Sequence, residues 1–167
     1  MRRVLIAVLL CLCASAALAG VPPKLGATVT DGYIRPAVNQ FANSAAALSG
    51  ALDRLSRSPD GPRFDTVRQR FDDVIDAWFR IFFLRFGPMV EDNRFERIYF
   101  WPDPRGVILR QVGTLLAKND PTALDPNRLA EKSVAVQGLP ALEYAIFGSG
   151  SNAIVENTPD GSYRCAY

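Results

Sequence analysis

Apolar residues recur every three or four positions along residues 64–86, and this spacing constrains the fold more than any other feature of the sequence. Between them stand Arg and Asp, as on a helix that buries one face and leaves the other in water. The stripe consists of Phe64, Val67, Phe71, Val74, Ile75, Trp78, Ile81, Phe82 and Leu84. So many large side chains on one helix predict a thick core built from helices, and we interpret the stripe as packing rather than as a cofactor-binding surface.

A second helix is predicted over residues 31–56, where a similar apolar stripe occurs. Thr30 or Asp31 is its expected N-cap, because a short polar side chain there can accept a hydrogen bond from the first turn. Pro36 lies near enough to that turn to be tolerated with some distortion.

Two more helices are predicted after a long connection, residues 87–104, that has no helical period. One runs from residue 105 or 106 to residue 117. The other has Asp125 as N-cap and Pro126 at the first helical position, and it ends at Gly148. Helices joined by short or medium connections predict an all-α fold, an antiparallel four-helix bundle.

The last of these helices contains an internal contradiction in QGLPALEYAIFG, residues 137–148. Leu139, Leu142, Ile146 and Phe147 follow the spacing of a buried helical face, yet Gly138 and Pro140 share one turn with them. In a helix interior glycine costs about 1 kcal/mol relative to alanine, and proline about 3 kcal/mol. We expect the helix to kink or break here and to leave the carbonyl groups of residues 136 or 137 without helical donors.

Residues 1–19 have the organisation of a secretory signal peptide. Two arginines precede a short apolar core, residues 4–12, and an Ala-Leu-Ala cleavage site precedes Gly20. A retained membrane anchor is the alternative, although the apolar run ends in Ala and Ser and is too short to span a bilayer. We therefore expect secretion to the periplasm or cell envelope, and one helical domain over residues 20–167.

The charge balance and the absence of histidine exclude several classes of function. The sequence has 19 Lys and Arg and 17 Asp and Glu, so loss of Arg2 and Arg3 with the signal peptide leaves a neutral mature chain. A neutral chain offers no basic surface to a polyanion, and no nucleic acid partner is expected. The absence of histidine excludes Ser-His-Asp and Cys-His nucleophile pairs and His-Glu-x-x-His zinc helices.

Cys165 is the one cysteine outside the predicted signal peptide. In an oxidising compartment such a cysteine usually has a partner in another chain or in sequence not shown. The ending SYRCAY begins a helical pattern and stops, so we interpret the chain as a fragment that lacks a C-terminal half. A natural short form with a frayed end is the alternative.

Charged residues gather around Trp101 in the long connection. They are Asp92, Arg94, Glu96, Arg97, Asp103 and Arg105. Loops often carry binding residues, so one hypothesis is a carboxylate and guanidinium patch that faces a cleft. The other is a solvated loop held by exposed ion pairs, each worth about 0.2–1 kcal/mol.

Glu143 is a second candidate, because it lies three residues after Pro140 and on the same helical face. On an ordinary helix it would be a surface residue. Its apolar neighbours instead favour partial burial, and a buried carboxylate needs a partner.

The segments WPDPRG (residues 101–106) and LAEKSVAVQGLPALEYAIFG (residues 129–148) resemble the imelysin-like family of exported bacterial proteins. The resemblance is clear over residues 71–148 and looser in the helix before them. The family is named for an insulin-cleaving metallopeptidase and includes relatives associated with iron uptake. The resemblance implies a fold of two helical bundles related by duplication, with the conserved site near their junction, and this chain would supply the N-terminal bundle.

The family hallmark is Gly-x-His-x-x-Glu, a metal-binding motif, and it corresponds here to Gly138, Pro140 and Glu143. By the resemblance the cofactor is a divalent metal or iron, and Glu143 is the metal ligand that remains. Proline has no lone pair to replace the imidazole, and one carboxylate does not hold an ion tightly.

Three functions follow from the resemblance and this replacement. The first is a non-catalytic binding or accessory protein of the cell envelope, linked to metal or iron uptake and acting with an envelope partner or with the missing half. The second is a metallopeptidase of the imelysin type, which requires a metal-bound water and a general base. The third is a structural or interaction module that has lost the metal site.

Overall fold

The computed structural model describes residues 21–156 and 158–167, so the predicted signal peptide, residues 1–19, lies outside the described residues. The chain divides into two compact units, Met1–Pro36 and Ala37–Tyr167. A single domain over residues 20–167 stays a prediction. Within the described residues every regular element is helical, which confirms the predicted all-α class. None of these helices is both long enough and apolar enough to cross a bilayer.

The first unit shows how Pro36 distorts the start of a helix. A short helix, α2 (Leu25–Val29), leads into a π-helical turn, η2 (Thr30–Ile34), in which the Arg35 N–H donates to the Thr30 carbonyl five residues back. Proline has no N–H and its ring crowds the preceding turn, which widens the helix there. The expected distortion near Pro36 is therefore confirmed, and the regular helix begins at Arg35. The predicted N-cap at Thr30 or Asp31 is wrong, because both residues lie inside η2 and α2 precedes them.

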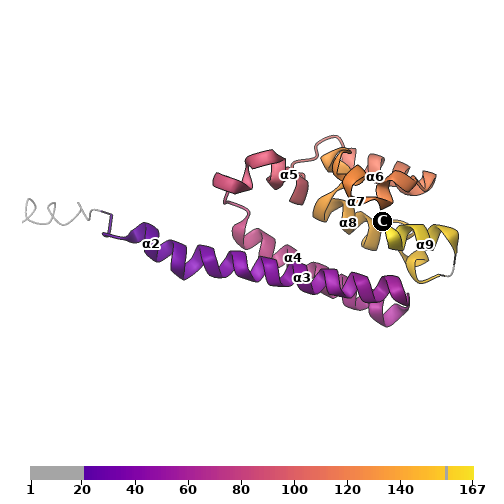
Figure 1. Cartoon of the computed structure of the whole chain (residues 1–167), viewed down its shortest axis with the longest axis horizontal. Helices are drawn as coiled ribbons and strands as arrows, with labels where there is room; N and C mark the ends of the chain where they lie inside the picture. The colour runs from indigo at the N-terminus through magenta and orange to yellow at the C-terminus, as the bar shows by residue number, and fades with distance from the viewer. Residues whose placement is uncertain (1–20, 157) are drawn as a thin grey trace, which may run out of the picture. The chain divides into compact units, whose positions relative to one another are not determined.

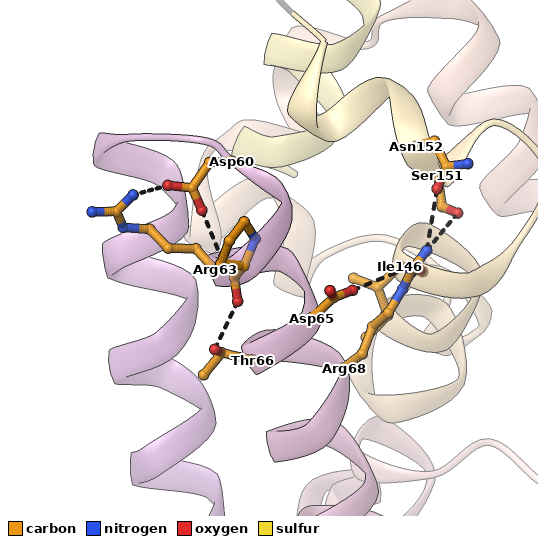
Figure 2. Close-up of polar contacts among 9 residues, drawn as sticks. Asp60, Arg63, Asp65, Thr66, Arg68, Ile146, Ser151 and Asn152 are labelled. Atoms are coloured by element: carbon orange, nitrogen blue, oxygen red, sulfur yellow. Dashed lines mark hydrogen bonds and ion pairs between the residues drawn. The ribbon is translucent and has the colours of Figure 1, made fainter.

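In the second unit, two long helices form an antiparallel pair, α3 (Arg35–Arg57) and α4 (Gly61–Ile81) (Figure 1). Asp60 caps α4, because its carboxylate accepts the Arg63 N–H at 2.8 Å, and it also pairs with the Arg63 guanidinium (Figure 2). The buried face of α4 consists of Phe64, Val67, Phe71, Val74, Ala77, Trp78 and Ile81, and all of these except Ala77 belong to the predicted stripe. The helix ends at residue 81, not at residue 86 as predicted.

The core of this pair is aromatic. Trp78 is fully buried, and its ring lies 5.3 Å from the rings of Phe41 on α3 and Phe95 on the short helix α5 (Arg94–Ile98). The ring of Tyr99 lies 6.1 Å from Trp78. Burial of this many aromatic side chains supplies a large hydrophobic contribution and joins residues 94–99 to the long helices.

The connection after α4 was predicted to be irregular. It contains short helices instead. These are η3 (Gly87–Met89), η4 (Glu91–Asn93) and α5. Helices of three to five residues are too short to show a period in sequence, and tertiary packing of Phe95 holds α5 in place. The next helix, α6 (Val107–Lys118), agrees with its prediction.

The predicted fourth helix is wrong as one element, because it divides into three. These are α7 (Pro126–Ala130), η6 (Val134–Val136) and α8 (Gly138–Phe147), preceded by η5 (Pro121–Leu124). The Asp125 cap and the stop at Gly148 are confirmed. After α8 the chain forms η7 (Ser151–Val155) and α9 (Pro159–Ala166), and α9 packs against η7 and α6 (Figure 1).

A second cluster joins these shorter helices. It contains Val112, Leu115, Leu116, Ala123, Val136, Ala141 and Tyr163. The break in the predicted helix frees the Val136 carbonyl, as expected, and the Tyr167 hydroxyl donates to it at 2.7 Å. The carbonyl therefore keeps a hydrogen bond although its helical donor is missing.

The Asp120 side chain connects the start of this region to Lys132 in its middle. Its interactions predict a contribution to the stability of the fold that is lost in acid. Its carboxylate accepts from the backbone and hydroxyl of Thr122, at 2.9 and 2.7 Å, and lies 2.9 Å from the Lys132 ammonium. These contacts lower the pKa of Asp120 to about 2. The unfolded value is about 3.9, so the contribution is present above pH 4 and disappears as pH falls through about 2.

We expect Asp120→Asn to abolish this part of the acid sensitivity. Between pH 4 and pH 2 the free energy of unfolding should fall less in the variant than in the wild-type protein, measured by urea unfolding at each pH. Asp72→Asn, which changes an exposed aspartate of α4, serves as the control and should keep the wild-type pH dependence. Equal acid sensitivity in Asp120→Asn and the wild type would show that the network contributes nothing.

Candidate functional site: an aromatic cleft beside helix α8

The start of α8 explains why Gly138 and Pro140 stand together. Gly138 is the first residue of α8 and has φ +71°, a conformation that glycine adopts without steric cost. Pro140 is the third residue, where the backbone N–H would have no helical acceptor in any case. The two poor helix formers therefore begin a helix and do not interrupt one.

Gly138 also packs directly against the end of α5. A Cβ atom at this position would lie 2.5 Å from the carbonyl oxygen of Ile98 and closer still to that of Arg97. Only a residue without a side chain allows this approach.

Two guanidinium groups hold the other end of α8. Arg68 of α4 donates to the Ile146 carbonyl at 3.0 Å and to the Ser151 hydroxyl at 3.3 Å (Figure 2). Arg164 of α9 donates to the Ala145 carbonyl at 3.2 Å. The last carbonyl groups of a helix lack intrahelical donors and carry partial negative charge, so both cations stabilise this terminus. Both ends of α8 are thus fixed to the rest of the unit.

One face of α8 borders a cleft of about 460 Å³, called here the aromatic cleft. The opposite walls come from residues 99–103 and from α6. Its lining consists of Tyr99, Phe100, Trp101, Asp103, Ile108, Leu109, Pro140, Glu143, Tyr144, Phe147 and Gly148. The cleft therefore brings together four of the predicted site residues, namely Trp101, Asp103, Pro140 and Glu143.

Glu143 lies at this cleft but is exposed, so the expected partial burial is wrong. Its carboxylate forms no hydrogen bond and no ion pair with any residue in the described part of the chain. Burial, and in second place the charge of Glu143, raise the pKa of the Tyr99 hydroxyl. Glu143 is thus an acidic group that faces aromatic walls without a cation to balance it.

Asp103, the other carboxylate of the cleft, has a structural role at the start of α6. Its two oxygens accept the N–H groups of Val107 at 2.8 Å and Ile108 at 2.9 Å. These hydrogen bonds lower the pKa of Asp103 below its ordinary value. The side chain is therefore ionised at neutral pH, but both of its oxygens are already engaged.

The other predicted site residues lie outside the aromatic cleft. The Arg94 guanidinium is 3.5 Å from Asp92 and 3.4 Å from Glu91, all three exposed, as in the hypothesis of a solvated loop. Arg105 is exposed and does not belong to the lining. Gly138 instead contributes to a larger cleft of about 600 Å³, lined mainly by apolar residues of α3, α8 and α9.

Most of the aromatic lining was not predicted from the sequence. Phe147 was assigned to the buried stripe, yet 45% of it is exposed. The consecutive aromatic residues Tyr99, Phe100 and Trp101 were a detectable signal beside the charged cluster. Tyr144 gave no such signal in the sequence, because a tyrosine on an apolar helix usually packs in the core.

A sequence model of the imelysin family, described as a peptidase family, matches residues 31–167. The chain belongs to the imelysin family. Among solved structures, it is similar to the crystal structure of an imelysin-like protein from Psychrobacter arcticum 273-4, with 25% sequence identity and a TM-score of 0.70. No curated protein matches it.

The similarity to the Psychrobacter protein covers 84% of this chain and 42% of that protein. This imelysin-family chain therefore spans less than half the length of that relative. The family resemblance and the helical fold predicted from sequence are confirmed.

The residues of the aromatic cleft do not fit the metal that the resemblance implies. Pro140 lines the cleft at the position of the motif histidine and offers no donor atom. Glu143 is the motif ligand that remains, and both oxygens of Asp103 accept backbone N–H groups. In residues 21–156 and 158–167, no three His, Cys, Asp or Glu side chains lie close enough to hold an ion. One free carboxylate is too few ligands for tight coordination.

Proposed function

We propose that the protein is an exported, non-catalytic binding or accessory protein of the cell envelope, connected with metal or iron uptake through an envelope partner. Membership of the imelysin family and the organisation of residues 1–19 support this role. The observation that carries its non-catalytic character is Pro140, which lines the cleft where the family motif has a metal-binding histidine. The cleft keeps the shape of a ligand site but lacks the donors of a metal centre.

Calorimetric titration with ferrous, ferric and zinc ions tests the loss of the metal site. We expect the wild-type protein to bind these ions no more tightly than Glu143→Ala. Pro140→His should gain affinity by about tenfold or more, because an imidazole three residues before Glu143 restores the second motif ligand. The double variant Pro140→His/Glu143→Ala is the matched control and should lose that gain. Tighter binding by the wild type than by Glu143→Ala would contradict the loss of the metal site.

The peptidase alternative requires a metal-bound water and a general base at one site. Glu143 can supply one group but not both, so we expect no hydrolysis of an unfolded, fluorescently labelled polypeptide. The assay is run with and without a chelator. Hydrolysis that the chelator stops would overturn the non-catalytic assignment.

Pro140 also favours a second candidate, an interaction module that has lost the ancestral site. The two candidate functions differ in whether the ligand site around Glu143 is still intact. A gain of metal affinity in Pro140→His would indicate that the surrounding ligand site is intact. No gain would favour the interaction module.

A further inference from the structure

We infer that the aromatic cleft binds an organic cation, a positively charged nitrogen carried on a small apolar body. This inference deepens the proposed binding function and rests on it. It names the chemical class of the ligand that the cleft accepts once the motif histidine is absent.

The charge of the cleft selects a cation. Both charged side chains in its lining, Asp103 and Glu143, are acidic. Asp103 is engaged by the start of α6, so Glu143 supplies the carboxylate that is open to a ligand. The Arg68 guanidinium of α4 lies 5.5 Å from the centre of the Phe147 ring, and it already donates to Ile146 and Ser151 at the end of α8. The positive charge of Arg110 on α6 interacts with the Asp103 carboxylate and helps to lower its pKa.

The aromatic walls select an organic cation rather than a metal ion. Five aromatic side chains line the cleft: Tyr99, Phe100, Trp101, Tyr144 and Phe147. The faces of such rings attract ammonium groups that carry apolar substituents, and a carboxylate beside them adds direct charge attraction. A metal ion would instead require several oxygen or nitrogen donors.

The exposure of the rings and the size of the cleft limit the ligand to a small molecule. Trp101 is 59% exposed and Phe147 45% exposed, so large apolar surfaces remain for a ligand to cover. The volume of about 460 Å³ lies within the range of small-molecule sites, about 300–1,000 Å³. The rigid attachment of α8 at both ends keeps these groups in place before a ligand arrives.

Choline and its uncharged analogue 3,3-dimethylbutan-1-ol test the inference on the unmodified protein. The two molecules have nearly the same shape, so a difference in affinity reports the charge. The titration is followed by NMR through the backbone amides of Tyr144 and Gly148, with the buried Trp78 indole as an internal control. We expect choline to bind about fivefold or more tightly than the alcohol.

Two substitutions locate the site. Glu143→Gln removes the charge, and Trp101→Leu removes a ring but keeps an apolar side chain; each should weaken choline binding about fivefold. Matched controls change another glutamate and another exposed aromatic residue: Glu131→Gln at the exposed end of α7 and Phe86→Leu at a residue that is 64% exposed. Both controls should bind choline like the wild type.

Equal affinity for choline and the alcohol, or unchanged choline binding in Glu143→Gln and Trp101→Leu, would overturn the inference. So would the absence of any shift at about 10 mM choline, a concentration that detects even millimolar affinity. None of these outcomes changes the result of the metal titration or of the hydrolysis assay. Failure of the cation site is therefore distinguishable from failure of the proposed function.

Discussion

Gly138→Ala is expected to lower the free energy of unfolding by about 3 kcal/mol or more. An alanine with φ near +71° is strained, and its Cβ would overlap the carbonyl groups of Arg97 and Ile98. Backbone strain of this kind and overpacking each cost about 1–3 kcal/mol. Neither obstructing group is a flexible side chain, so α5 or α8 has to move. Urea unfolding followed by circular dichroism measures the loss.

The same change at Gly113 is the matched control. Gly113 lies inside α6, and an added Cβ would meet only the Tyr144 hydroxyl at an ordinary contact distance of 3.5 Å. Alanine is the better helix former, so Gly113→Ala should stabilise the protein by about 0.5–1 kcal/mol. If the two variants change the free energy of unfolding in opposite directions, the loss in Gly138→Ala comes from the close backbone approach at that position and not from replacing a glycine as such. Wild-type stability in Gly138→Ala would refute this account.

Trp78→Ala is expected to cost about 3–5 kcal/mol, as other large-to-small changes of buried aromatic residues do. The ring is fully buried and contacts Phe41, Phe82, Phe95 and Tyr99, which belong to α3, the end of α4, α5 and the cleft wall. Its removal leaves a cavity that no single neighbour can fill. The midpoint of urea unfolding should fall accordingly.

Trp78→Phe separates packing from polarity. The indole N–H of Trp78 has no hydrogen-bond partner among the described residues, so phenylalanine removes an unsatisfied donor together with part of the ring. We therefore expect a clearly smaller loss than in Trp78→Ala. Phe86→Ala, at an exposed phenylalanine, should change stability by less than about 0.5 kcal/mol. Equal losses in Trp78→Ala and Phe86→Ala would argue against a packed aromatic core.

Tyr99 connects the core around Trp78 with the proposed choline site. This residue packs its ring near Trp78 and also lines the aromatic cleft. A loosened core in Trp78→Ala should therefore weaken ligand binding as well as folding. Trp78→Phe, which keeps an aromatic neighbour for Tyr99, should affect binding less.

The sequence by itself determined where the longer helices lie but not the short ones, because the apolar period of a helix becomes visible only over several turns. The stripe of α4, the cap at Asp125 and the stop at Gly148 were all readable in the sequence. The absence of histidine removed whole classes of catalysis without any structure. The family was also recognisable, since its motif residues keep their spacing although Pro140 replaces the histidine.

Only the tertiary structure decided where α8 begins and what its side chains face. The reason is that its neighbours are remote in sequence: Gly138 approaches carbonyl groups of α5, the Tyr167 hydroxyl binds Val136, and Arg68 reaches the end of α8. A local pattern carries no information about such partners. The aromatic cleft likewise arises because residues 99–103, α6 and α8 meet in space, so its composition could not be read along the chain.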